Sequence, residues 1–211
     1  MTKIFKTVAV ATIALFMINP NSTKAQAYDE GIGFVSLGYG FPNLNKLLND
    51  FAESLDSDVK STGFGPMHLR FDYGLSETYS IGASVNFSNS GSKWDYETFD
   101  GNNNPVVYAE SFSRTSINFL VRLNKHFLDN DRFDLYSGVG IGYNYVSIKS
   151  ESEDPNFVED DFIDDFANIF PIGFESTIGL RFLFTENLGG YVEAGWSKSL
   201  VQFGVVYSFQ E

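Results

Sequence analysis

Residues 63–88 contain the same alternating pattern twice, on either side of a turn too short for anything but a hairpin. Each arm is about ten residues long, which is the length that a tilted strand needs to cross a bilayer. Polar or small residues separate the apolar positions, which are Met67, Leu69, Phe71, Tyr73 and Leu75 in one arm and Tyr79, Ile81, Ala83, Val85 and Phe87 in the other. A period of two is that of a β-strand with two different faces. The pattern therefore predicts a pair of membrane-crossing strands.

The start of the chain has the features of a secretory signal peptide. Lys3 and Lys6 precede an apolar run over 7–18, and the polar stretch that follows ends in small residues at Ala25 and Ala27. The run is shorter than the ~20 residues of a membrane-spanning helix. We predict cleavage after Ala27, so that residues 1–27 are a cleaved signal peptide and residues 28–211 form one outer-membrane β-barrel domain.

The charge and composition exclude several classes of protein. Loss of the three lysines of the signal peptide leaves 11 basic against 27 acidic residues, a formal charge of about −16, and such a surface repels nucleic acid. The chain has no cysteine, so neither a lipid-modified cysteine nor a disulfide can anchor or staple it. An aromatic content of 17% with 19 glycines favours an all-β fold over a soluble helical one.

Further alternating segments bring the number of strand candidates to eight. Beside the hairpin they are residues 31–41, 111–123, 133–147, 172–184, 189–197 and 200–209. Short connections at 75–78, 128–132 and 185–188 alternate with long ones at 42–62, 89–110 and 150–170. An even strand number with this asymmetry is typical of bacterial outer-membrane barrels. We predict an all-β, eight-stranded antiparallel up-and-down transmembrane β-barrel with short periplasmic turns and three long extracellular loops.

The polar face of these strands consists mostly of Gly, Ser, Thr and Asn, and all six lysines after the signal peptide fall in loops or at strand ends. Small side chains fit the interior of an eight-stranded barrel, which its own side chains nearly fill. The charged exceptions are Arg70, Asp72, Arg114, Arg122, Glu175, Arg181 and Glu193. Enclosed charges must be paired, and arginine pairs with carboxylates in a planar fork. We therefore predict a lumenal ionic network, with Arg114 near its outer rim.

Aromatic side chains on the opposite face concentrate toward the strand ends, as they do in the interfacial belts of membrane barrels. The outer belt is predicted at Trp196, Tyr143 and Tyr145, and the inner belt at Tyr73, Tyr79, Phe184 and Phe209. The alternative interpretation is that this face is the core of a soluble sandwich or of a lipocalin-like exported barrel.

The signal peptide, the eight alternating strands and a last strand ending in Tyr207-Ser208-Phe209 resemble the small eight-stranded outer-membrane barrels, of the type of outer membrane protein X and the barrel domain of outer membrane protein A. The composition is similar to that of barrels from Bacteroidota. The resemblance implies a bacterial outer-membrane location, contact with outer-membrane lipid and lipopolysaccharide, and recognition of the terminal aromatic residue by the barrel assembly machinery. In this chain Gln210 and Glu211 follow Phe209.

Some barrels of this size modify lipid A with a histidine, a serine and a carboxylate. Of the two histidines, His126 lies beside a predicted periplasmic turn and lacks the His-x-Ser-Asn pattern of the deacylases. His68 lies on the inward face, where Ser84 or Ser116 would have to approach it from another strand. Glycines 138, 140 and 142 are spaced by two inside a strand, unlike those of a nucleotide loop.

The connection over 150–170 contains eight acidic residues, but they lack the spacing of a dedicated calcium site. No catalytic residue, cofactor or metal is therefore expected. The sequence favours a non-enzymatic envelope-structural or surface-interaction anchor with a side-chain-filled lumen, whose acidic loops could meet an extracellular ligand. A small-solute channel, a lipid A-modifying enzyme and a soluble exported barrel are the alternatives.

Overall fold

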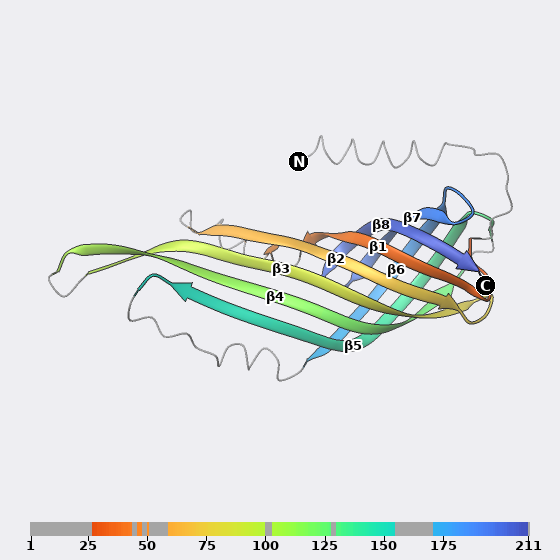
Figure 1. The fold of residues 1–211 in the computed structure, drawn as a ribbon, viewed down its shortest axis with the longest axis horizontal. Coiled ribbons are helices and arrows are strands. Elements are labelled where there is room, and N and C mark those ends of the chain that lie inside the picture. The colour runs from red at the N-terminus through yellow and green to blue at the C-terminus, as the bar shows by residue number, and fades with distance from the viewer. Residues whose placement is uncertain are drawn as a thin grey trace.

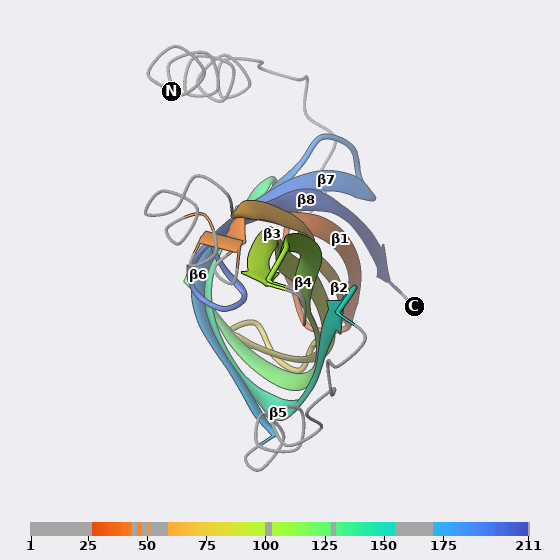
Figure 2. The ribbon, with the colours of Figure 1, turned by 90° about the vertical axis from the view of Figure 1, so that its left-hand side faces the viewer.

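The protein is a closed ring of eight antiparallel strands. The structure, a computed structural model, describes residues 27–43, 46, 47, 50, 59–99, 103–127, 130–154 and 171–210. Each strand pairs with its neighbours in the chain, and β1 pairs with β8 to close the ring (Figures 1 and 2). The strands are β1 (Ile32–Asn43), β2 (Lys60–Gly74), β3 (Tyr79–Phe99), β4 (Pro105–His126), β5 (Phe133–Ser152), β6 (Ile172–Leu183), β7 (Leu188–Trp196) and β8 (Ser199–Gln210). The predicted all-β, up-and-down barrel is confirmed.

The two faces of each strand are sharply different. In β2 the side chains of Leu69 and Phe71 are about half exposed on the outside of the ring, whereas Arg70 and Asp72 between them are buried. The same alternation continues around the ring, so the exterior is apolar and the interior is charged. Each Å² of apolar surface left in water costs ~25 cal/mol, so this exterior is suited to lipid.

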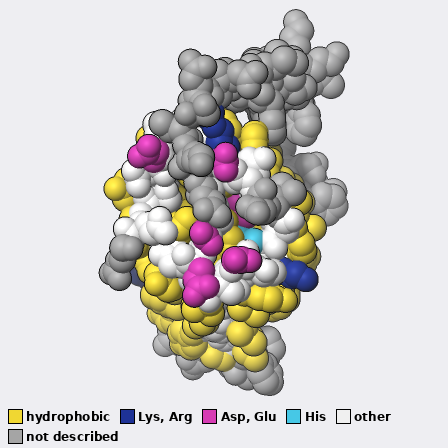
Figure 3. Space-filling view, turned by 90° about the vertical axis from the view of Figure 1, so that its right-hand side faces the viewer, with side chains coloured by type: hydrophobic (Ala, Val, Ile, Leu, Met, Phe, Trp, Pro, Cys, Tyr) yellow, Lys and Arg dark blue, Asp and Glu magenta, His cyan; other side chains and the backbone are white. Residues whose placement is uncertain are grey.

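We call the two ends of the ring the inner and the outer end. The inner end carries the short connections 75–78, 127–132 and 184–187, together with the start of β1 and the end of β8. Figure 3 views this end, where apolar side chains cover the flanks and acidic side chains gather on the end face. The exposed acidic residues here are Glu30, Glu77, Asp131 and Glu186. The outer end carries the other connections, of which the five-residue connection 100–104 and the two-residue turn at 197–198 are short.

The strands are very unequal in length at the outer end. β3 and β4 have 21 and 22 residues, whereas β7 has nine, and β2 to β5 continue far beyond the ring on one side (Figure 1). The expectation of a long loop over 89–110 is corrected: β3 continues to Phe99 and β4 starts at Pro105. Outside a membrane neither face needs to be apolar, so the hydrophobic alternation fades while the strands remain paired.

The described residues contain no helix that is long and apolar enough to cross a membrane. Residues 1–26, and with them most of the predicted signal peptide including Ala25, lie outside the described residues, as do most of the connections over 44–58 and 155–170. Ala27, the residue before the predicted cleavage site, is described and is buried at the inner end.

Candidate functional site: the charged lumen

Six of the seven charged residues predicted to face inward lie together in the middle of the lumen. Arg70 and Asp72 come from β2, Arg122 from β4, Glu175 and Arg181 from β6, and Glu193 from β7; all are at most 3% exposed. Their strands are not all neighbours in the ring, so the side chains meet across the lumen. This arrangement places ionised groups where water has little access, and such groups require partners.

Two arginines and two glutamates alternate in the outer half of this network. The Arg70 guanidinium lies 2.7 Å from Glu193 and 3.9 Å from Glu175, and Arg122 lies 3.2 Å from Glu193. Arg122 also donates a hydrogen bond to Glu175 Oε1. The Tyr136 hydroxyl donates to Glu193 Oε1 at 2.8 Å. Each charge therefore faces two of opposite sign, the condition under which buried ions are tolerated.

A second group of charges lies nearer the inner end. Arg181 Nη1 donates to Asp134 Oδ2 at 2.9 Å, and its Nη2 lies 3.6 Å from Asp72 Oδ2. The guanidinium also lies 3.7 Å from the centroid of the Phe34 ring, close enough for a cation–π contact. Asp134 binds His126 Nδ1 at 2.7 Å, and His126 Nε2 lies 3.0 Å from Ser80 Oγ.

Neither Asp134 nor His126 was predicted to belong to the network. In β5, Asp134 lies two and four residues before Tyr136 and Gly138, so its side chain is on the same inward face. This alternation was the signal in the sequence that could have predicted its inward position. Asp134 was not predicted to face the lumen because it lies beside a turn, where acidic residues usually face water. His126 was expected near the turn, and its inward parity in β4 is shared by Asn124 and Arg122.

Neutral polar side chains supply many of the remaining hydrogen bonds. Asn124 Nδ2 donates to Asp72 Oδ1 at 2.9 Å, and Asn86 Nδ2 donates to Glu175 Oε2 at 3.4 Å. Gln202 accepts a hydrogen bond from Arg70, and His68 Nδ1 bonds to Asn86 Oδ1 at 2.8 Å. His68 is therefore held by an amide, and neither Ser84 nor Ser116 has a described hydrogen bond to it.

Glycines provide the space that this network occupies. A Cβ at Gly140 would lie 2.7 Å from Glu175 Cγ, and one at Gly138 would lie 2.8 Å from Arg122 Nη2. A Cβ at Gly82 would collide with the Asp72 carboxylate. The glycine spacing of two in β5 thus reflects the size of the charged side chains opposite.

At the outer mouth of the lumen, as far as the structure describes it, a buried lysine is held by neutral oxygens and not by carboxylates. Lys198, in the turn between β7 and β8, donates hydrogen bonds to Ser116 Oγ and, at 3.5 Å, to Asn144 Oδ1. Burial, with the nearby positive charge of Arg114, lowers the pKa of Lys198 to about 7. Arg114 is partly exposed, and none of the ion pairs between described residues includes it.

The predicted belt residues form two groups at opposite ends of the ring. Trp196 is the last residue of β7 and Tyr143 pairs with Ile172, the first residue of β6; Tyr145 lies two residues further out. At the inner end Tyr73, Tyr79 and Phe184 flank short turns, and all six of these side chains are at least 36% exposed. Phe209 is half-buried, with its ring over Gly33 and 6.2 Å from that of Phe71.

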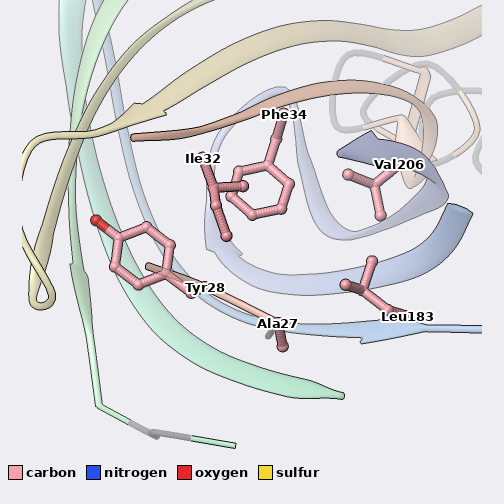
Figure 4. Close-up of a cluster of buried hydrophobic side chains, with 6 residues drawn as sticks. All are labelled: Ala27, Tyr28, Ile32, Phe34, Leu183 and Val206. Atoms are coloured by element: carbon pink, nitrogen blue, oxygen red, sulfur yellow. The ribbon is translucent and has the colours of Figure 1, made fainter. Parts of the chain in front are cut away.

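An apolar cluster fills the lumen at the inner end. Figure 4 shows side chains from the segment before β1, from β1 itself, and from β6 and β8 drawn together at this place: Ala27, Tyr28, Ile32, Phe34, Leu183 and Val206. The ion pairs of the network lie further toward the outer end than this apolar cluster. Within the described ranges, no group of three or more His, Cys, Asp or Glu side chains is placed to hold a metal ion.

No protein-family model and no curated protein matches the chain. Among solved structures, Ail, the attachment invasion locus protein of Yersinia pestis, in complex with the heparin analogue sucrose octasulfate, is 16% identical with a TM-score of 0.39, covering 85% of this chain and 99% of that one. A second Ail structure is 13% identical with the same coverage and TM-score. The outer membrane protein OprG of Pseudomonas aeruginosa is 9% identical, with a TM-score of 0.45 and coverage of 88% and 99%.

The fold is assigned from the ring itself, because eight antiparallel strands close it, its exterior is apolar and its lumen is charged. This architecture defines the small eight-stranded outer-membrane β-barrels. The resemblance to this class is confirmed at the level of the fold.

Proposed function

We propose that the protein is an anchor of the bacterial outer membrane that acts at its outer surface by binding rather than by catalysis. The observation that carries the proposal is the unequal length of the strands. About 11 residues suffice to cross a membrane, so β3 and β4 extend about ten residues further, which is roughly 30 Å at ~3.3 Å per residue. The extended parts of β2 to β5, together with residues 153 and 154 that directly follow β5, form a platform for a partner.

The filled lumen supports the anchor role over that of a channel. Ion pairs occupy its middle and apolar side chains occupy its inner end. In this proposal the two aromatic groups, at Trp196, Tyr143 and Tyr145 and at Tyr73, Tyr79, Phe184 and Phe209, lie at the membrane interfaces. Lipopolysaccharide surrounds the outer group, the signal peptide is cleaved after Ala27, and the barrel assembly machinery inserts the chain.

The charge of the platform indicates the kind of partner. Its described part carries more acidic residues (Asp95, Glu97, Glu110, Glu151, Glu153 and Asp154) than basic ones (Lys60, Lys93, Arg114 and Lys149). A net negative surface attracts cationic partners and repels anionic ones. Ail was crystallised with an anionic ligand, whereas we propose a basic extracellular protein surface as the partner of this chain.

Removal of the β3–β4 part of the platform tests the proposal. Gly91 pairs with Ser113, so a two-residue Asn-Gly turn can replace residues 92–112. We expect the shortened protein still to migrate differently on a gel before and after boiling, as closed barrels do, but to lose salt-sensitive binding to immobilised polylysine. Asp95→Asn with Glu97→Gln is the matched variant and should weaken that binding without any deletion.

Unchanged binding to polylysine by the shortened protein would contradict the platform role. Loss of the gel shift would show that the extension is needed for folding, and would equally contradict a separable platform.

A further inference from the structure

We propose that Ser80, His126 and Asp134 form a serine-nucleophile site at the inner end of the lumen that can cleave an acyl ester, and that Tyr28 covers it. This site lies at the opposite end of the ring from the platform, so it goes beyond the proposed anchor role. It also runs against the expectation from the sequence that the chain has no catalytic residue.

The three side chains have the order of contacts that nucleophilic catalysis requires. Ser80 Oγ lies 3.0 Å from His126 Nε2, and His126 Nδ1 lies 2.7 Å from Asp134 Oδ1. They come from β3, β4 and β5, which are consecutive in the ring, and all three are at most 5% exposed. A nucleophile bonded to a base that a third group orients is the recognisable signature of such a site.

The surroundings fix the roles of the groups. Arg181 holds the other oxygen of Asp134 at 2.9 Å, so this carboxylate is oriented with Oδ1 toward the imidazole. With the Nδ1 hydrogen donated to Asp134, Nε2 is the nitrogen free to accept the Ser80 hydroxyl proton. The other titratable groups that face the imidazole ring are Tyr28 and Tyr136.

An amide donor lies beside the nucleophile. Asn124 Nδ2 donates to Ser80 Oγ at 3.0 Å and to Asp72 Oδ1 at 2.9 Å. A hydrogen bond accepted by Ser80 Oγ from this amide leaves the Ser80 hydroxyl hydrogen to point toward His126 Nε2. We assign Asn124 as a positioning residue for Ser80.

Tyr28 shields the site from solvent. Its ring stacks on that of His126 with centroids 3.4 Å apart and an angle of 4° between the planes. The Tyr28 hydroxyl donates to the Ser76 carbonyl at 2.8 Å, and burial raises the pKa of Tyr28, so it remains a donor. In the proposed mature chain, which begins at Tyr28, a backbone hydrogen bond from Gly31 N to Gly74 O holds this segment. This cover lies before β1 and is not part of the strand ring.

The reaction balances with water as the second reactant. Ser80 Oγ forms a bond to the ester carbonyl carbon as its proton passes to His126 Nε2, and the C–O bond to the alcohol breaks as that proton passes to the leaving oxygen. Water then attacks the acyl-Ser80 ester and gives a proton to His126. Release of the carboxylic acid returns that proton to Ser80.

Labelling with a fluorophosphonate reporter tests the proposal on the full chain extracted from membranes in mild detergent. The reporter loses fluoride and forms an O–P bond only with an activated serine. We expect mass mapping to place the label on Ser80. Tyr28→Ala should label about tenfold faster, because a ring stack that opposes access is removed. His126→Gln, which lacks the base that accepts the Ser80 hydroxyl proton, should label much more slowly than the wild type.

Two further variants and a gel complete the experiment. Ser80→Ala should abolish the label, whereas Ser88→Ala, a buried serine on the same face of β3, should retain it. The gel shift on boiling confirms that each variant is folded. Absence of label from both the wild type and Tyr28→Ala would overturn the proposal, as would label on the wild type that persists in Ser80→Ala.

Discussion

The middle of the lumen and its outer mouth hold buried cations in two different ways. In the middle, Arg70 and Arg122 face Glu175 and Glu193, so each positive charge meets two negative ones. At the mouth, Lys198 is held by the neutral oxygens of Ser116 and Asn144, and a second cation, Arg114, lies near it. Arginine keeps its charge under these conditions, whereas the pKa of lysine shifts readily.

The paired arginines therefore stabilise the folded protein, whereas the buried lysine, which has no carboxylate partner among the described residues, destabilises it. Removal of one partner from a buried pair leaves the other charge uncompensated, which costs much more than the pair itself contributes. Loss of a buried lysine that is already partly neutral instead removes the free-energy cost of burying its charge. The two regions should therefore respond to mutation with opposite signs.

The largest effect is expected from Arg122→Ala. The substitution leaves Glu175 and Glu193 each with one fewer cation in the lumen, and should lower the free energy of unfolding by about 3–5 kcal/mol. Urea unfolding of the refolded barrel in detergent, followed by tryptophan fluorescence, measures it. Val121→Ala, the outward-facing neighbour in β4, is the control and should cost clearly less. Equal losses of unfolding free energy in the two variants would show that the ion pairs of Arg122 do not stabilise the barrel.

A smaller effect is expected from Gly140→Val in β5. A Cβ at this position would lie 2.7 Å from Glu175 Cγ, so the larger side chain displaces the carboxylate from Arg122. Such overpacking costs about 1–3 kcal/mol. The same urea titration checks it against Ser137→Val, which faces outward on the same strand. A Gly140→Val protein as stable as the wild type would mean that the network is not closely packed.

The third effect concerns Lys198 and has the opposite sign. Its pKa is lowered from 10.5 to about 7 in the folded state, so between these values the unfolded chain binds the extra proton. The free energy of unfolding must then increase as pH rises from about 7 to about 10.5. Above this range the cost of burying the charge of Lys198 no longer applies. Lys198→Met should flatten this part of the curve and be more stable at pH 7. Parallel curves for the two proteins would contradict the buried position of Lys198.

The architecture was predictable from local signals, but the partners within the lumen were not. Alternation at Met67–Leu75 and its counterparts predicted the strands and the inward position of Arg70 or Glu193, because a period of two assigns every side chain to one face. Contacts such as that of Arg122 with Glu193, 71 residues apart on strands that are not neighbours, depend on closure of the ring and on side chains that cross the lumen. No spacing along the chain reports them.

The outer parts of β3 and β4 were missed for a related reason. Beyond the ring both faces of residues 93–99 and 105–110 are at least partly exposed, so no apolar face marks them as strand. Hydrophobic alternation appears in a strand only where its two faces meet different environments, so a strand exposed on both faces lacks the pattern. The ends of the strands within the ring were therefore predicted better than the outer ends of β3 and β4.

Planar-bilayer recording of the purified wild-type protein tests most directly whether the ion pairs and the apolar cluster close the lumen. We predict no steady conductance above that of the bare bilayer, because charged side chains fill the middle and apolar ones fill the inner end. A steady, large conductance from the folded wild-type barrel would contradict the closed lumen and favour a channel.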